Sequence, residues 1–179
     1  MRNKKIQNLV KIPLMTVIII LCSWITLPFP VPLTLQTFGL YAALLLIGGR
    51  MGTLSLLLYI LLGCVGLPVF SGFSSGAGHL ISPTGGYIWG FLLCTLLYLA
   101  LEKVASNSYL IKGLILFSGT LICYLSGTLW FMYTAAGQSS LYTVLTLCVL
   151  PYIIPDSLKL ISAIFISKKV KPIIDKIKE

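Results

Sequence analysis

The sequence predicts an all-α integral membrane protein with six transmembrane helices and both termini in the cytoplasm. Hydrophobic residues make up 58% of the 179 positions and charged residues only 9%, compared with about 25% charged residues in an ordinary soluble domain. Two further observations support this prediction. The chain contains long charge-free stretches, and its basic residues are confined to one side of the predicted spans. Because no Ser/Gly/Pro-rich linker divides the chain, we expect residues 1–179 to form a single membrane domain.

The charge-free stretches set the number of spans. They separate Lys11 from Arg50, Arg50 from Glu102, and Lys112 from Asp156. A membrane helix needs about 20 residues, so each stretch is long enough for two helices, or for one helix and a loop at membrane depth. The predicted spans lie near residues 13–27, 34–48, 52–67, 84–101, 113–135 and 156–173.

Two prolines interrupt the chain before the last predicted span. The apolar run from Leu141 to Leu150 is separated from that span by Pro151 and Pro155. Proline disrupts a helix interior, and non-helical backbone at membrane depth must be shielded by protein or by a water-filled cavity. A kinked or re-entrant segment next to a cavity is therefore expected here.

Basic residues predict the orientation of the chain in the cell membrane. The loops at residues 28–33, 68–83 and 137–140 contain neither Lys nor Arg. The basic residues at the opposite ends of the spans are Arg2, Lys4, Lys5, Lys11, Arg50, Lys103, Lys112, Lys168, Lys169, Lys171, Lys176 and Lys178. By the positive-inside rule they lie in the cytoplasm. The net charge of +9 is explained by this topology and by contact with the lipid bilayer, without a nucleic-acid partner.

Asp156 and Lys159 are charged residues at the start of the last predicted span. Charged groups inside a membrane are costly and are associated with functional sites. Their spacing places them on one helix face within reach of each other. Asp156 follows Pro155, where it could also serve as a helix cap or first-turn acid. The pair is thus either a structural cap or an acceptor and a donor for a ligand that offers both.

The outer loop at residues 68–83 and the glycines after it form the second unusual region. The loop is long for a compact domain, as lids often are, and its His79 has no partner in sequence that indicates a metal site or a catalytic base. Gly85 and Gly86 would allow close approach of a ligand to the backbone, with Tyr87 supplying a ring and a hydroxyl. The spacing of Gly86 and Gly90 is also typical of helix packing.

Four stretches resemble the BioY family, the biotin-specific substrate-binding (S) components of energy-coupling factor (ECF) transporters. They are residues 30–38 (PVPLTLQTF), 66–70 (GLPVF), 83–87 (PTGGY) and 155–159 (PDSLK). The resemblance implies a six-helix protein that binds biotin from outside in a buried pocket covered by outer loops. It also implies docking on a transmembrane coupling protein and two cytosolic ATPases, with no chemistry performed by this chain and no cofactor.

The resemblance assigns ligand contacts to Asp156 and Lys159, with Gly85, Gly86 and Tyr87 beside the pocket. Biotin's ureido ring has two N–H donors and one carbonyl acceptor, which an acid and a lysine can match. Its carboxylate needs donors, for which Gln36 and backbone N–H groups are candidates, although Lys159 could pair with that carboxylate instead. The candidates for the apolar wall are Phe70, Trp130 and Tyr152, and His79 is a possible ligand-facing polar group.

Three other functions compete with this interpretation. An S component for a different vitamin would use the same scaffold, since fold does not fix the ligand. A membrane-embedded enzyme would need more acids, a His pair or a metal cluster than the spans contain, so we predict neither catalytic nor metal-binding residues. An ion-coupled transporter would show internal repeats and several buried acids. The sequence also lacks a Gly-x-x-x-x-Gly-Lys-Ser/Thr motif, so ATP hydrolysis would belong to partners.

Overall fold

The structure is a computed structural model that describes residues 4–29, 31–105, 108–134 and 141–176. These residues are mostly helical and include one two-stranded hairpin. The elements in chain order are α1 (Lys4–Trp24), β1 (Thr26–Leu27), β2 (Leu33–Thr34), α2 (Gln36–Ile47), α3 (Gly49–Cys64), the 3-10 helix η1 (Ser71–Phe73), α4 (Ala77–Ile81), α5 (Gly85–Ala105), α6 (Tyr109–Thr134), α7 (Leu141–Cys148) and α8 (Leu150–Lys176).

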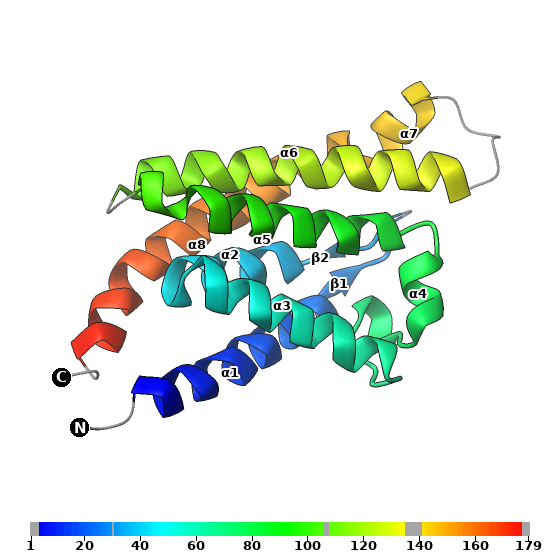
Figure 1. The fold of residues 1–179 in the computed structure, drawn as a ribbon. Coiled ribbons are helices and arrows are strands. Elements are labelled where there is room, and N and C mark those ends of the chain that lie inside the picture. Colours follow the sequence, from blue (N-terminus) through cyan, green and yellow to red (C-terminus); the bar gives the residue numbers. More distant parts are fainter. Residues whose placement is uncertain (1–3, 30, 106–107, 135–140, 177–179) are drawn as a thin grey trace.

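The long helices pack in pairs (Figure 1). Helices α5 and α6 lie side by side along one side of the molecule, and α1 packs against α3 on the opposite side. Helix α2 packs against α8 between these pairs. Helix α1 begins and α8 ends at one end of the molecule, whereas the β-hairpin, α4 and α7 lie at the other end. The predicted outer loops at residues 28–33 and 68–83 are therefore gathered at one end, and the one at residues 137–140 lies outside the described residues.

Small residues bring α5 and α6 close together. A Cβ atom added to Gly90 would lie 2.8 Å from the Cα of Cys123, and one added to Gly119 would lie 2.5 Å from the Sγ of Cys94. Neither position can therefore carry a side chain without moving the opposite helix. The helix-packing interpretation of the glycine spacing is confirmed at Gly90, since close backbone approach is what small residues permit between membrane helices.

Each of the six predicted spans falls largely on a helix. Three helical segments are long and apolar enough to cross a membrane, namely Gly85–Ala105, Tyr109–Thr134 and Tyr142–Ile174. The shorter apolar helices are Val10–Trp24, Gln36–Ile47 and Gly49–Cys64. The helices match the predicted segments, and the number of membrane crossings remains a prediction.

A break separates the apolar run from the last span, as predicted, but it lies at Val149 and not at Pro151 or Pro155. Helix α8 starts at Leu150 and continues through Pro155, and only a turn at Val149 separates it from α7. Pro151 lies in the first turn of α8, where a missing N–H removes no intrahelical bond. Pro155 removes one bond from the helix interior, and the neighbouring Ser157 hydroxyl donates to the carbonyl of Ile153 at 2.7 Å. Neighbouring helices and Ser side chains make such prolines tolerable in membrane helices.

Two outer segments contain structure that the sequence did not indicate. Residues 26–34 form an antiparallel hairpin in which Thr26 pairs with Thr34 and Leu27 with Leu33. The segment 68–83, predicted as a loop, contains η1 and α4. Its chain reversals use Gly72 and Gly76, whose φ angles of 65° and 89° favour glycine.

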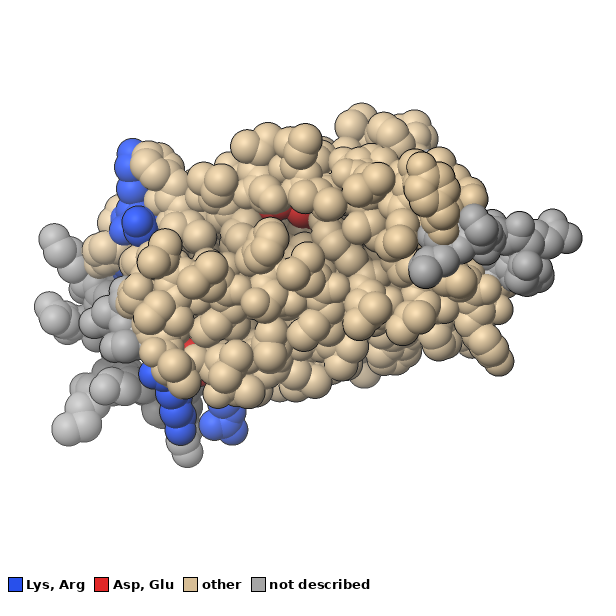
Figure 2. All heavy atoms as spheres, turned by 90° about the horizontal axis from the view of Figure 1, so that it is seen from above, with Lys and Arg blue, Asp and Glu red and all other residues tan. Residues whose placement is uncertain are grey.

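Charged side chains are unevenly distributed over the surface. On the face shown in Figure 2, the Lys and Arg side chains gather at the end where α1 begins and α8 ends, and most of the remainder is uncharged. This asymmetry agrees with the one-sided placement of basic residues in the sequence. The side of the membrane that this end faces stays a prediction of the positive-inside rule.

Candidate ligand-binding cavity

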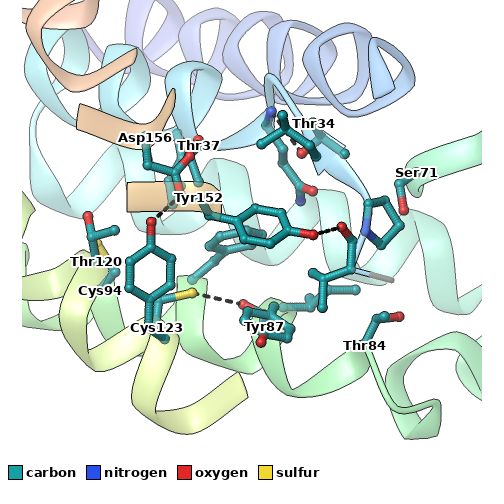
Figure 3. Close-up of a pocket in the computed structure, with 18 of the residues that line it drawn as sticks. Thr34, Thr37, Ser71, Thr84, Tyr87, Cys94, Thr120, Cys123, Tyr152 and Asp156 are labelled. Carbon is teal, nitrogen blue, oxygen red and sulfur yellow. Dashed lines mark hydrogen bonds between the residues drawn. The ribbon is translucent and has the colours of Figure 1, made fainter. Parts of the chain in front are cut away.

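A cavity lies between the helices and the outer segments (Figure 3). Helices α2, α3, α5, α6, α7 and α8 contribute to its wall, together with residues 31–34 and the segment 68–83. None of the lining residues in the described part of the chain lies on α1. The space free of protein atoms is about 780 Å³, a volume that includes the part open to solvent. The aromatic lining residues are Tyr41, Tyr59, Phe70, Tyr87, Phe91, Tyr124 and Tyr152.

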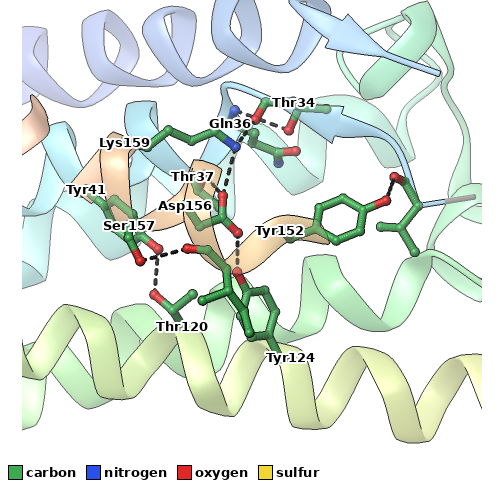
Figure 4. Close-up of polar contacts among 12 residues, drawn as sticks. Thr34, Gln36, Thr37, Tyr41, Thr120, Tyr124, Tyr152, Asp156, Ser157 and Lys159 are labelled. Atoms are coloured by element: carbon green, nitrogen blue, oxygen red, sulfur yellow. Dashed lines mark hydrogen bonds and ion pairs between the residues drawn. The ribbon is translucent and has the colours of Figure 1, made fainter. Parts of the chain in front are cut away.

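Asp156 is the centre of a hydrogen-bond network on one side of this cavity (Figure 4). Its Oδ1 accepts from the hydroxyl of Thr37 at 3.0 Å and from the Nζ of Lys159 at 2.8 Å. Its Oδ2 accepts from the hydroxyl of Tyr124 at 2.6 Å. Asp156 retains an exposed fraction of only 7%. Donors from α2, α6 and α8 therefore hold this buried carboxylate in place, as a buried charge requires.

Lys159 balances the charge of Asp156 and also holds the first outer segment. Its Nζ donates to the carbonyl oxygen of Thr34 at 2.6 Å, in addition to its ion pair with Asp156. The predicted pairing of the two residues on one helix face is confirmed. The prediction that Asp156 caps the helix is wrong, because α8 begins at Leu150 and has no acid in its first turn. A lysine has three N–H donors, so one remains for a ligand.

Tyr41 and Thr120 extend the polar wall away from Asp156. Their hydroxyl oxygens are 2.6 Å apart, and the Thr120 hydroxyl donates its single hydrogen to the carbonyl of Leu116 at 2.8 Å. The Tyr41 hydroxyl must therefore be the donor to Thr120. Neither hydroxyl therefore has a hydrogen left for a ligand, whereas the Tyr41 oxygen can still accept a hydrogen bond.

Gln36 and Tyr59 differ from the rest of the wall because their polar ends are unpaired. Both line the cavity, with exposed fractions of 5% and 0%. Among the described residues, neither the Nε2 of Gln36 nor the hydroxyl of Tyr59 has a partner at hydrogen-bond distance, although the side chains of Gln36 and Ser23 lie close to that hydroxyl. Buried donors without partners are costly and need an explanation. A polar ligand group in the cavity would supply the missing partner.

Tyr152 joins α8 to the first outer segment. Its hydroxyl donates to the carbonyl oxygen of Val31, and its ring meets that of Phe29 edge to face at 6.5 Å. Tyr87 lines the cavity from α5, and its hydroxyl donates to the carbonyl of Cys148 at 3.4 Å. The structure thus brings both predicted tyrosines into the wall.

His79 and Phe70 come to the cavity from the segment 68–83. Their rings stack with centroids 4.9 Å apart, and both line the cavity. The Ser74 hydroxyl donates to the carbonyl of Ser71 at 2.7 Å, so His79 Nδ1, 3.3 Å from that hydroxyl oxygen, must be the donor. Partial burial lowers the pKa of His79. Its neutral form is therefore favoured at pH 7.

The segment 68–83 is fastened to the helices beneath it. The Ser23 hydroxyl donates to the carbonyl of Val69 at 2.6 Å, and the indole N–H of Trp24 donates to that of Pro68 at 2.9 Å. Phe70 packs directly on Gly63 of α3, where an added Cβ would lie 2.1 Å from the ring. The segment therefore rests on α1 and α3 through specific contacts.

Gly85, Gly86 and Trp130 lie outside the cavity lining, unlike the other predicted ligand contacts. A Cβ on Gly85 would lie 2.1 Å from the carbonyl oxygen of Leu80, and one on Gly86 would lie 2.2 Å from the Cβ of Trp130. The indole N–H of Trp130 donates to the carbonyl of Ser82 at 3.0 Å. These residues hold the tight connection of α4 to α5 against α6, so the structure gives them a packing role.

Sequence reasoning missed several polar residues of the cavity wall. Thr37, Tyr41, Tyr59, Thr120 and Tyr124 all lie in apolar helices. Thr37 follows Gln36 directly within the stretch that resembles BioY, and this position could have identified Thr37 as a residue of the site. The others reach the site only through tertiary packing of α2, α3 and α6.

Comparison with known proteins shows which family the chain belongs to. The model of the BioY family matches residues 1–176. The chain belongs to the BioY family. One BioY relative, a probable biotin transporter of Pyrococcus horikoshii, is 39% identical over 143 residues, which are 79% of this chain and 82% of that protein. The biotin transporter BioY of Thermotoga maritima is 33% identical over 168 residues, 92% and 96% of the two chains.

A solved structure shares the fold of this BioY-family chain. It is a crystal structure of the S component for biotin from an ECF-type ABC transporter. The TM-score is 0.86 at 28% sequence identity, and the match covers 96% of this chain and 94% of the other. The similarity therefore extends over the whole helical framework that surrounds the cavity.

Proposed function

We propose that this chain is the biotin-binding S component of an ECF-type transporter, which captures biotin from outside for ATP-driven import by partner subunits. Membership of the BioY family supports this function, as do relatives named as biotin transporters and a biotin S component with the same fold. The protein binds and transports its ligand and is not an enzyme. The protein is located in a membrane, in agreement with its apolar helices.

The observation that carries the proposal is the buried ion pair of Asp156 and Lys159 on the wall of an aromatic cavity. An ionised carboxylate accepts about four hydrogen bonds, and Asp156 receives three from the protein. The remaining site fits a ureido N–H of biotin, and the remaining N–H of Lys159 fits the ureido carbonyl. Both groups are already in position, so a ligand that matches them loses little to reorganisation.

The rest of biotin fits the remaining wall. Its fused rings and valeryl chain are apolar, and the cavity offers aromatic faces that include Phe70, Tyr87 and Tyr152. We assign the unpaired Nε2 of Gln36 and the unpaired hydroxyl of Tyr59 as donors to ligand oxygen atoms. A ligand without acceptors would leave these two groups unsatisfied, which disfavours it.

The outer segments serve as the cover of the site. The hairpin that contains Val31 and the segment 68–83 both contribute to the cavity wall. Biotin would enter between these two segments, because helices form the rest of the cavity wall. The anchoring contacts of Tyr152 with Val31 and of Trp130 with Ser82 would therefore limit ligand exchange.

The topology and partners follow from the family and the charge distribution. We propose six membrane crossings, with both termini in the cytoplasm and the outer segments outside the cell membrane. The partners are an ECF transmembrane coupling protein and two cytosolic ATPases. The absence of a Gly-x-x-x-x-Gly-Lys-Ser/Thr motif from the sequence agrees with ATP hydrolysis in partners.

The test is a titration of ligand-free protein in nanodiscs with biotin, thiamine and riboflavin. We expect biotin alone to bind tightly. Asp156→Asn and Lys159→Ala should each weaken binding by at least about 2 kcal/mol, as for loss of one partner of a buried charged contact. Lys103→Ala is the matched control, because Lys103 is exposed and lies outside the cavity lining.

The outcomes separate the competing functions. Preference for thiamine or riboflavin would identify an S component for another vitamin. Failure of a folded protein to bind any of the three would refute the biotin assignment. Equal losses in Lys103→Ala and Lys159→Ala would show that the ion pair has no special part in binding.

A further inference from the structure

Three lysines gather where α6 begins and α8 ends, at the end of the molecule opposite the outer segments. The Nζ of Lys112 lies 5.2 Å from the ring centroid of Tyr109, and the Nζ of Lys168 lies 5.4 Å from the same centroid. Lys171 is close enough to Lys112 for their charges to repel. We call Lys112, Lys168 and Lys171 the lysine cluster.

Lys112 is buried without a full partner for its charge. Its exposed fraction is 8%. Within the described residues, Lys112 and Lys168 have neither an ion pair nor a hydrogen-bond acceptor for their ammonium groups. The face of one aromatic ring attracts a cation, but it accepts no N–H bond of ordinary strength, and here two cations share it. A buried ammonium group without an acceptor is unfavourable.

The described acid that attracts Lys112 is already engaged. Glu102, at the end of α5, attracts Lys112, and its Oε2 accepts from the backbone N–H of Gly49 at 2.5 Å. The carbonyl of Leu45, near the end of α2, accepts from the Nζ of Lys171 at 3.4 Å. These contacts fix Lys171 beside the end of α2. The acids whose side chains the structure describes are Glu102 and Asp156, and Asp156 lies at the cavity, so the three ammonium groups outnumber the described carboxylates beside them.

An apolar stripe adjoins the cluster along α8. Ile161, Phe165 and Lys168 follow one another at helical spacing, and the first two have exposed fractions of 62% and 58%. Lys169 also stands over the ring of Phe165 at 4.5 Å. A surface that is apolar at one end and basic at the other matches an amphiphile, whereas a free anion would use only the basic end.

We propose that the lysine cluster binds the phosphate group of an anionic phospholipid, with an acyl chain against Ile161 and Phe165. The phosphate would supply the acceptors that Lys112 and Lys168 lack. Basic pockets between membrane helices are known to hold anionic headgroups, and lysine pairs with phosphate as a point charge. Lipid bound here would fill the space between α6 and α8 and brace both helices.

The test measures lipid retention by the delipidated full chain in detergent with native mass spectrometry. The probes are phosphatidylglycerol, phosphatidylcholine with the same acyl chains, and inorganic phosphate. We expect phosphatidylglycerol to bind at least about tenfold more tightly than phosphatidylcholine. Lys168→Gln should weaken its binding about fivefold, and Lys112→Gln/Lys168→Gln more than about tenfold, at roughly one lysine's contribution each.

The matched control is Arg50→Gln/Lys103→Gln, which removes the same charge from exposed residues outside the cluster. It should retain the preference for phosphatidylglycerol. An equal loss in the control would overturn the proposal in favour of diffuse surface charge. Equally tight binding of inorganic phosphate would overturn it in favour of a free-anion site.

Two further outcomes would also overturn the lipid site. One is equal retention of the two lipids by the unmodified chain. The other is a cluster variant that keeps phosphatidylglycerol but no longer joins the coupling protein, which would make the cluster a protein interface. Lys168→Gln keeps the test valid if the double variant unfolds, because Lys168 is exposed. Biotin takes no part in the measurement, so its result is independent of the ligand assignment.

Discussion

The two sides of the cavity are built differently. Around Asp156, side chains from three helices satisfy one another through short hydrogen bonds. Across the outer segment 68–83, the contacts are a ring stack, a ring against a glycine and bonds to backbone carbonyls. The first arrangement holds the polar groups in position before a ligand binds. In the second, the segment can move away from the helices without leaving a buried charge unpaired. Recognition and closure therefore reside in separate parts of the wall.

The largest effect should come from removing one charge beside Asp156. Asp156→Asn leaves Lys159 buried without its ion-pair partner and should lower the free energy of unfolding by about 3 kcal/mol or more. Asp156→Asn/Lys159→Met removes both charges and should recover most of the stability but none of the biotin affinity. Thermal unfolding in detergent and biotin titration measure the two quantities. A double variant as unstable as the single one would contradict the assigned role of the unpaired lysine.

The next effect concerns the outer segment. Gly63→Ala would place a Cβ 2.1 Å from the Phe70 ring and should displace that ring, at a cost of about 1–3 kcal/mol for overpacking. Biotin dissociation should accelerate because the cover closes less well. Gly78→Ala is the control, since a Cβ there meets nothing within 4 Å. Equal dissociation rates in a stopped-flow chase of all three proteins would exclude closure by Phe70.

A change at Gln36 should separate binding from stability. Gln36→Met removes the unpaired Nε2 at similar side-chain length. The melting temperature of the ligand-free protein should stay constant or rise, while biotin binding weakens by about 1–1.5 kcal/mol, the net value of one hydrogen bond. Calorimetric titration and thermal unfolding test this pair of effects. A fall in stability without loss of affinity would mean that Gln36 serves the fold alone.

The smallest effect should appear as a dependence on pH. Burial lowers the pKa of His79 below its value of about 6.5 in a solvated chain. The neutral, stacked form therefore stabilises closure fully above about pH 6.5, and this contribution is lost as pH falls through the lowered pKa. Biotin should dissociate faster near pH 5 than at pH 7, in a manner that His79→Gln abolishes. The same acceleration in the variant would assign the effect to another group.

The fold was more predictable from sequence than the site. Charge-free stretches located the helices, because the membrane demands long apolar segments. The spacing of Asp156 and Lys159 predicted their contact, because it is local to one helix. Tyr124 and Thr37 could not be linked to Asp156, because those bonds join helices far apart in sequence. Pro155 misled the prediction because the helix-breaking rule from water is weaker where neighbouring helices support the backbone.

The composition of the cavity wall affects how the sequence of such a protein can evolve. Helix α1 supplies none of the described lining residues, and Leu14, Val17 and Leu21 form an exposed row along it. Substitutions in that row can alter which proteins or lipids the helix meets without touching a ligand contact. Selection on assembly and selection on ligand can therefore act on separate segments of one short chain, and either trait can diverge while the other is retained.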